Sequence, residues 1–307
     1  MRLLVVGAGA TGGYFGGRLA AAGRDVTFLI RPKRAAEIAK NGFVIVDPKG
    51  ETRIEPKIVT ADKLGGVYDL VLISVKAYSL AAALDDIAPA IGPNTLILPV
   101  LNGLKHFDTL SERFGGDRVI GSFCKINARL DDHGRIIQMS PLHDMIYGEY
   151  DGSHTPRMAA IDAFFKGAGF DARLSDDVGR ELWEKWVLLA SLGAANCLMR
   201  GSIGDIIARP GGQSFIEALL GEVSAVATAH GKAPNPTYLE ATRKLLTTSG
   251  SPMTASMYRD LVKGLPVEND EILDDLLDRA GSVGIKTPYL HLAAINLGIY
   301  AARRLAE

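Results

Sequence analysis

The chain has 307 residues, which is enough for two domains, and its 47% hydrophobic and 22% charged residues are ordinary values for a globular protein. The formal net charge of −1 excludes a global electrostatic signature for nucleic acid or for an anionic membrane, so any basic feature must act locally. The two cysteines, Cys124 and Cys197, form no CxxC pair. We therefore expect no metal site and interpret both as buried side chains in a reducing compartment.

No segment has the pattern of a membrane or secretion signal. The apolar run Leu3–Val6 is shorter than the apolar core of a signal peptide, which needs about 7–15 residues. The longest uncharged stretch, Trp186–Met199, has 14 residues. A membrane-spanning helix needs about 20. We expect a buried helix here, no membrane association and a cytoplasmic location.

Short apolar strands alternate with helices through the first half of the chain. Strands are predicted at residues 2–9, 25–31, 69–76, 94–103, 117–130, 134–140 and 144–152. Helices are predicted at residues 11–23, 33–42, 79–92 and 105–115. Nearly continuous apolar strands separated by helices are typical of a parallel sheet covered on both faces.

The second half of the chain contains only helical patterns. Helices are predicted at residues 176–199, 214–231, 235–248, 257–264, 269–284 and 288–306. An α/β region followed by a run of helices predicts two domains. We expect an α/β fold with a doubly wound, mostly parallel sheet over residues 1–172, followed by an all-α C-terminal domain over residues 173–307.

A glycine-rich segment joins the first strand to the first helix. In VVGAGATGG, Gly7, Gly9 and Gly12 fit the G-x-G-x-x-G pattern, and the segment lies in a βαβ unit of about 30 residues, as in Rossmann-type nucleotide-binding domains. Gly7 would make the tight turn, Gly9 would let a pyrophosphate approach the backbone, and Gly12 would let helix and strand pack closely. The pyrophosphate would bind at the helix N-terminus. The alternative is a glycine-rich turn that binds no ligand.

The end of the second strand indicates which dinucleotide binds. NAD-binding units carry an Asp or Glu about 20 residues after the glycines, where it bonds the ribose 2′-hydroxyl. Here Arg31 stands 19 residues after Gly12, and Lys33 and Arg34 follow it. Because a guanidinium can hold a 2′-phosphate that a carboxylate would repel, the sequence predicts NADPH. The alternative is a solvated arginine at a strand end.

Two polar residues follow later strands of the predicted sheet. Lys76 follows the apolar run at 69–75, and Asn102 follows the apolar run at 95–101. Ligands of open α/β sheets bind beyond the carboxyl ends of the strands, so both residues are candidates for the site. The alternatives are a solvated lysine and an ordinary Asn-Gly turn.

The motifs together resemble those of the ketopantoate reductase (2-dehydropantoate 2-reductase) family. The resemblance rests on GAGATGGYFGGRLAAAGRDVTFLIR, ISVKA, LNG, LWEKW and TASMYRDLVKGLPVEND, in the family's order and at its approximate spacing over nearly the whole chain. It implies a Rossmann domain followed by a helical domain. The implied reaction is the NADPH-dependent reduction of a 2-keto acid to a 2-hydroxy acid, 2-dehydropantoate to pantoate, in pantothenate biosynthesis.

The resemblance also implies roles for individual residues. The family's catalytic lysine matches Lys185 in LWEKW, its glutamate near the substrate hydroxyl matches Glu268, and its serine for the substrate carboxylate matches Ser256. Hydride addition to a ketone leaves an alkoxide, which a lysine can protonate or stabilise. Asn102 matches a residue that orients substrate, and Lys76 one that lies near cofactor and substrate. In the same way, Arg31 matches the family's basic residue for the 2′-phosphate.

The substrate half of the pattern departs from the family. Where the family usually has asparagines, this chain has Leu189, Gly193 and Ile203. Asn196 and Ser191 are the nearby polar side chains that could substitute. Losing an amide that bonds a substrate hydroxyl costs about 1–3 kcal/mol per buried group. A further family glycine corresponds here to an aspartate, Asp274.

Three functions follow from these patterns. The first is the NADPH-dependent 2-keto acid reductase, and the second is a reductase of a different 2-oxo or 3-oxo acid. The third is a non-catalytic NADPH-binding protein. The resemblance further implies a homodimer, although the long helices predicted near 213–230 and 289–305 could equally pack within the domain core.

Overall fold

The computed structural model describes residues 1–306 and divides into two compact units. One unit comprises Met1–Leu101 and His106–Val178, and the other comprises Asn102–Lys105 and the chain from Gly179 onward. The first unit is built on strands with helices, and the second is helical. The predicted fold class, a Rossmann-type α/β region followed by an all-α region, is confirmed.

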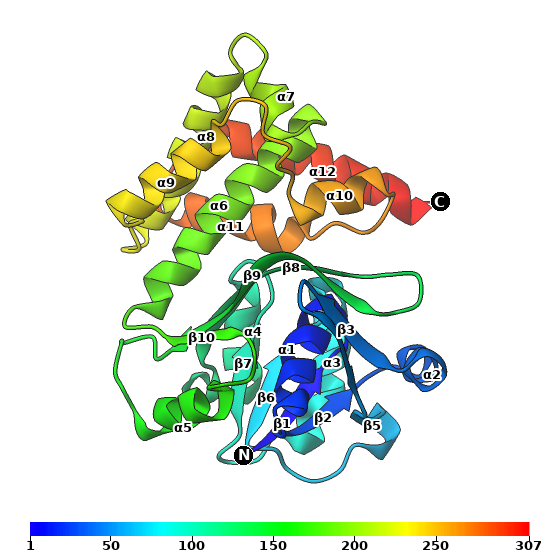
Figure 1. Ribbon diagram of the computed structural model, residues 1–307. Coiled ribbons are helices and arrows are strands. Elements are labelled where there is room, and N and C mark those ends of the chain that lie inside the picture. Colours follow the sequence, from blue (N-terminus) through cyan, green and yellow to red (C-terminus); the bar gives the residue numbers. More distant parts are fainter. Residues whose placement is uncertain (307) are drawn as a thin grey trace. The chain divides into compact units, whose positions relative to one another are not determined.

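Five parallel strands form the first sheet of this unit (Figure 1). Its members are β1 (Arg2–Val6), β2 (Asp25–Leu29), β5 (Lys57–Val59), β6 (Leu70–Ile73) and β7 (Leu96–Pro99). The spatial order is β5-β2-β1-β6-β7. The chain thus runs outward from β1 in one direction and resumes with β6 on its other side. This reversal beside β1 is where such sheets bind ligands.

Helices and short 3₁₀ turns lie between the strands of the first unit. The helices are α1 (Ala10–Ala21), α2 (Pro32–Asn41), α3 (Leu80–Ile87), α4 (Lys105–Phe114) and α5 (Pro156–Phe165). The 3₁₀ turns are η1 (Ala61–Lys63), η2 (Ala77–Ser79), η3 (Ala88–Ala90) and η4 (Gly116–Arg118). The predicted helices at 11–23, 33–42, 79–92 and 105–115 are therefore present, with shifted ends.

A second sheet, which the sequence patterns did not predict, covers α1. It contains β3 (Phe43–Asp47), β4 (Gly50–Ile54), β8 (Gly121–Leu130), β9 (Ile136–Gly148) and β10 (Asp171–Leu174). The order is β10-β9-β3-β4, and β8 pairs with β9 in antiparallel fashion. The two strands predicted at 134–140 and 144–152 are largely one continuous strand, β9. The strands β3, β4, β5 and β10 were missed because they are short, and β4 and β10 also carry charged residues at alternate positions.

The glycines of α1 explain how this helix fits between two sheets. A Cβ added at Gly16 would lie 2.7 Å from Phe28 Cε1 and 2.8 Å from Val5 Cγ2, both on the parallel sheet. A Cβ at Gly17 would lie 2.7 Å from Ile45 Cδ1, on the second sheet. Glycine on both faces therefore lets α1 approach both sheets closely, at the cost of weaker helix propensity. The segment GGYFGG encodes this arrangement.

The helical unit matches the predicted helices, with one addition. Its elements are α6 (Val178–Met199), α7 (Ile203–Ile207), α8 (Gly212–Ala229), α9 (Pro236–Leu246), α10 (Ser256–Val262), the π-helical turn η5 (Asp270–Asp274), α11 (Asp275–Ser282) and α12 (Pro288–Ala306). The short α7 was not predicted, although Ser202 and Asp205 form a reciprocal capping box at its start. Over residues 1–306, no helix combines the length and apolar character needed to span a membrane.

Both cysteines are free thiols inside the fold, as predicted. Cys124 lies on β8 and Cys197 on α6, and both are buried. Burial raises the pKa of the Cys197 thiol to about 12. An undissociated thiol is a poor nucleophile, so Cys197 has the chemistry of a small apolar core residue.

Candidate active site

The glycine-rich turn after β1 has the geometry that close approach of a ligand requires. Gly7 has a φ angle of +93°, which residues other than glycine rarely adopt. A Cβ added at Gly9 would meet no atom within 4 Å, so the backbone there faces open space. A Cβ at Gly12 would lie 1.9 Å from Ser74 Oγ and 2.3 Å from the Gly7 carbonyl oxygen. Gly12 therefore allows the close contact between helix and turn.

Two side chains that the sequence analysis did not assign to the site hold this turn in place. The hydroxyl of Ser74, just after β6, donates to the Val6 carbonyl oxygen at 3.0 Å, with the Gly7 carbonyl oxygen at 3.1 Å. Arg34 donates from Nε to the Ala8 carbonyl oxygen at 3.0 Å and from Nη2 to that of Gly134 at 2.8 Å. Part of the basic cluster after β2 therefore braces the loop instead of facing a ligand.

The N-terminus of α1 leaves backbone donors available to an anion. Gly9 is the N-cap residue and supplies no side-chain hydrogen bond, and the first turn contains no acidic residue. The unpaired N–H groups and the positive end of the helix dipole favour a phosphate here. The open backbone at Gly9 and this uncapped helix end fit the pyrophosphate of a dinucleotide.

Arg31 and Lys76 follow strands on either side of β1. Arg31 is exposed at the N-cap of α2, and its Nη2 donates to Ser79 Oγ at 3.1 Å. Lys76 is exposed at the N-cap of the 3₁₀ turn that ends at Ser79. Because parallel strands end at the same edge, both residues lie at the carboxyl edge of the sheet, as predicted. Ser79 is a further polar group beside Arg31, and no spacing rule had indicated it.

In the helical unit, Lys185 and Glu268 lie on segments that are bonded to each other. Lys185 is half-buried on α6, and Glu268 is 8% exposed, two residues before the π-helical turn η5. Trp186, next to Lys185, donates its indole N–H to the Ile272 carbonyl oxygen of η5 at 3.0 Å. Residues 86 positions apart are thereby joined.

The loop that carries Asn102 also packs against η5. Gly103 has φ of +77°, and a Cβ added there would lie 2.1 Å from the Glu271 carbonyl oxygen. The segments of Asn102, Lys185 and Glu268 therefore meet at one turn of the helical unit. Burial raises the pKa of the Glu271 carboxyl, and the nearby Lys105 ammonium opposes this shift. Burial and Asp270 likewise raise the pKa of Asp274.

Ser256 begins α10, and Asn196 helps to hold it there. The Asn196 Oδ1 atom accepts a bond from the Ala255 N–H at 2.8 Å, and its Nδ2 donates to the Gly201 carbonyl oxygen at 2.8 Å. Asn196 is fully buried and its amide is engaged by the backbone at both ends. It is therefore a structural residue, which argues against its replacing a substrate-binding asparagine.

The other positions at which the chain departs from the resemblance are apolar or enclosed. Ile203 is completely buried in the core. A Cβ added at Gly193 would lie 2.7 Å from Met257 Cε, so the buried Met257 side chain occupies the space beside it. Ser191 is 1% exposed, and its hydroxyl has no hydrogen-bond partner within residues 1–306. Ser191 lies six residues from Lys185, about 120° away from it around the helix axis.

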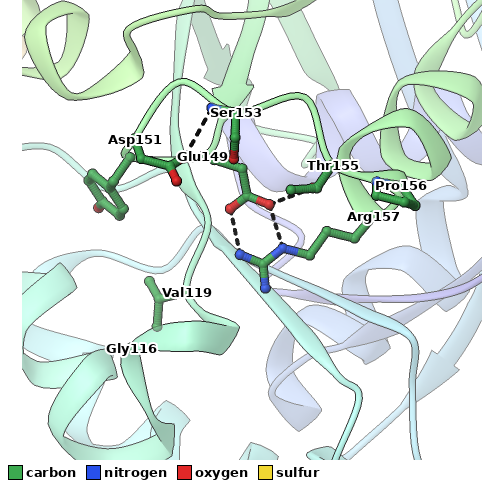
Figure 2. A pocket seen from close by; sticks show the side chains of 9 residues that line it. Gly116, Val119, Glu149, Asp151, Ser153, Thr155, Pro156 and Arg157 are labelled. Carbon is green, nitrogen blue, oxygen red and sulfur yellow. Dashed lines mark hydrogen bonds and ion pairs between the residues drawn. The ribbon is translucent and has the colours of Figure 1, made fainter.

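A surface hollow of about 550 Å³ in the first unit has none of the predicted site residues in its lining (Figure 2). Its lining includes Glu149 and Arg157, which form a two-bonded ion pair, and Thr155 donates its hydroxyl to Glu149 at 2.6 Å. Arg157 also donates to the Asp117 carbonyl oxygen. The polar groups of Glu149 and Arg157 are thus satisfied by each other and by their neighbours. We interpret the pair as a brace between β9 and α5.

The glycine turn after the central strand, the uncapped α1 N-terminus and the basic residue after β2 define a Rossmann-type dinucleotide-binding protein. Two family models match the chain: "Ketopantoate reductase PanE/ApbA" over residues 3–152 and "Ketopantoate reductase PanE/ApbA C terminal" over residues 177–297. The chain belongs to the ketopantoate reductase family. It is accordingly an oxidoreductase that acts on CH–OH groups with a nicotinamide cofactor.

Individual relatives extend over the full chain. The uncharacterized oxidoreductase YkpB of Bacillus subtilis is 34% identical over 304 residues, which is 99% of this chain and 100% of that protein. A 2-dehydropantoate 2-reductase of Halobacterium salinarum is 27% identical and covers 96% of this chain and 97% of its own. The crystal structure of the 2-dehydropantoate 2-reductase from Geobacter metallireducens is 28% identical, with a TM-score of 0.86 over 97% of this chain and 99% of that one.

Proposed function

We propose that the protein reduces a 2-keto acid to a 2-hydroxy acid with NADPH. Residues 1–172 would form the NADP-binding domain and residues 173–307 the helical substrate domain. The observation that carries the proposal is the meeting of three segments at η5, those of Asn102, Lys185 and Glu268. These are the residues that the family resemblance assigns to the reaction, and they come from distant parts of the sequence.

Arg31 is the residue that we expect to select NADPH over NADH. Gly7, Gly9 and Gly12 would hold the pyrophosphate, and Arg31, with Ser79 at 3.1 Å, would bind the ribose 2′-phosphate. Titration of the protein with NADPH and with NADH, followed by cofactor fluorescence, tests this assignment. Equal affinity for the two cofactors would contradict it.

The proposed mechanism needs an acid and groups that orient the substrate. When bound, NADPH would supply a hydride to the keto carbon. Lys185 donates a proton to the carbonyl oxygen, so that the alkoxide becomes the product hydroxyl. Glu268 orients the Lys185 ammonium or the product hydroxyl. Asn102 and Lys76 position the substrate near the cofactor.

Ser256, at the start of α10, would bind the substrate carboxylate. Turnover of a panel of 2-keto acids, followed by NADPH absorbance, tests the proposed reaction as a whole. Tight NADPH binding without turnover of any 2-oxo or 3-oxo acid would instead indicate a non-catalytic NADPH-binding protein.

A second candidate is a reductase of a different 2-oxo or 3-oxo acid, and the surroundings of Gly193 favour it. Met257 fills the space beside Gly193, Leu189 is apolar, and the Asn196 amide is engaged by the backbone. A substrate hydroxyl that binds beside Leu189 would lose its partner, at a cost of about 1–3 kcal/mol.

A pair of substrates separates the two candidates. 2-Dehydropantoate and 3,3-dimethyl-2-oxobutanoate differ only in the distal hydroxyl. The second candidate predicts a kcat/KM for the hydroxyl-free acid equal to or above that for 2-dehydropantoate. A preference for 2-dehydropantoate of about tenfold or more, which corresponds to about 1.4 kcal/mol, would favour pantoate formation.

We also propose a homodimer, as the family resemblance implies. Leu292, Ile295 and Ile299 on α12 are each about half exposed and recur at helical spacing. Light scattering of the wild-type protein and of Ile295→Lys tests this surface. A dimer that persists unchanged in the variant would place the interface elsewhere.

A further inference from the structure

Trp186 contacts the π-helical turn η5 through its indole N–H and contacts the following helix, α11, through the face of its ring. Its indole N–H donates to the Ile272 carbonyl oxygen at 3.0 Å, and the side chain is 1% exposed. The Arg279 guanidinium carbon lies 5.6 Å from the ring centroid. Arg279 Nε in turn donates to both carboxylate oxygens of Asp275, at 3.1 and 3.2 Å. Every one of these partners lies within residues 272–279.

The neighbouring tryptophan, Trp183, packs against the Trp186 ring with 5.1 Å between centroids, but its other contacts differ. Its ring stacks on His230 with 5.2 Å between centroids, at the C-terminal end of α8. His230 Nε2 donates to the Arg279 carbonyl oxygen at 3.0 Å. Trp183 therefore touches the same region only indirectly, and it makes no hydrogen bond to η5 among those of the described residues. Trp183 is thus a control residue, because it is a tryptophan on α6 without a hydrogen bond to η5.

Two residues from other segments contact the π-helical turn. Bonding of residue i to i+5 is rare, occurs mostly as single turns, and is frequently found at functional sites. Gly103 packs against the Glu271 backbone, and Trp186 bonds the next residue, Ile272. Glu268 stands two residues before the turn, and Lys185 one residue before Trp186. The bond from Trp186 to Ile272, at 3.0 Å, thus joins the segment of Lys185 to that of Glu268.

We propose that Trp186 is a positioning residue, whose N–H sets the placement of Glu268 relative to Lys185. The inference rests on the proposed roles of these two residues. Proton transfer depends on hydrogen-bonding distance between the groups concerned. A displacement of about 1 Å can lower a rate by about 10²-fold. Loss of the bond would leave the buried Ile272 carbonyl without its donor. The turn would then shift until this carbonyl meets another hydrogen-bond donor.

The test compares variants of the two tryptophans. Trp186→Phe keeps an aromatic ring and removes the donor, and Trp183→Phe is the matched control. A second variant replaces Trp186 with benzothienylalanine, which has sulfur in place of the N–H and nearly the same shape, so that no cavity forms. The measurements are kcat, KM for NADPH and keto acid, the pH dependence of kcat, and the thermal midpoint.

We expect both Trp186 variants to lose about 10- to 100-fold in kcat. The apparent pKa values of the kcat profile should move, while KM for NADPH stays unchanged. Trp183→Phe should keep the wild-type rate and pH profile. A benzothienylalanine variant with wild-type kcat and pH profile would overturn the proposal. Retention of full activity by Lys185→Ala would instead refute the proposed role of Lys185, independently of Trp186.

Discussion

Gly9 and Gly12 stand three residues apart in one motif, yet the structure predicts opposite effects for an added methyl group. At Gly9 the new Cβ meets nothing within 4 Å, and φ of −77° suits any L-residue. Alanine there should leave stability unchanged or raise it by about 0.4–1 kcal/mol, because the unfolded chain loses freedom. The same methyl group would project towards a bound pyrophosphate, so NADPH affinity should fall.

At Gly12 the methyl group has no space even without a ligand. Its two nearest atoms would be Ser74 Oγ at 1.9 Å and the Gly7 carbonyl oxygen at 2.3 Å. The hydroxyl can rotate, but the carbonyl belongs to the turn, so the helix must move away from it. Overpacking of this kind costs about 1–3 kcal/mol. Removing Ser74 Oγ in Gly12→Ala/Ser74→Ala relieves one contact and should recover only part of that loss.

Urea denaturation and NADPH titration of the same preparations measure both effects. Gly9→Ala should unfold at the wild-type midpoint or above, with an NADPH Kd raised at least tenfold. Gly12→Ala should unfold at lower urea. Wild-type NADPH affinity in Gly9→Ala would refute the proposed pyrophosphate site. Wild-type stability in Gly12→Ala would refute the packing argument.

Three further substitutions test the proposed acid and two structural residues. Lys185→Ala should lower kcat by about 10²–10⁴, the range for one general acid, and wild-type turnover would remove Lys185 from the mechanism. Arg157→Met should destabilise the fold by about 2 kcal/mol. This cost lies between those of breaking a surface and a buried ion pair, because the Arg157 side chain is 36% exposed. The ion pair lowers the pKa of Glu149 below its usual 4.5, so its stabilisation is present above pH 4.5 and is lost as the pH falls through the lowered pKa. The wild-type and Arg157→Met midpoints should therefore converge on acidification, and a constant gap would contradict the assignment. Asn196→Leu should lower the free energy of unfolding, measured by urea denaturation, by about 2–4 kcal/mol. The substitution leaves the Ala255 N–H and the Gly201 carbonyl without their side-chain partner.

Much of the fold could be predicted because its signals are local. Residues close together in the sequence are enough to reveal the apolar run of β1 and the glycines that follow it. The same is true of the periodicity of the long amphipathic helices. The second sheet was missed because β4 and β10 are short and carry alternating charges. Their stability comes from pairing with β3 and β9, at separations of up to 27 residues in the sequence, which periodicity cannot reveal.

The sequence by itself determined the class of fold, the glycine turn, the basic residue at position 31 and the candidate lysine at position 185. The first three depend on residue type and short spacing, and the candidate lysine depends on the resemblance to the family. Only the tertiary structure decided that Arg34 braces the turn through the Ala8 carbonyl. It likewise decided that Asn196 is occupied by the backbone and that Trp186 joins α6 to η5. Which groups a side chain bonds depends on packing between segments distant in the chain, and no local spacing rule encodes those contacts.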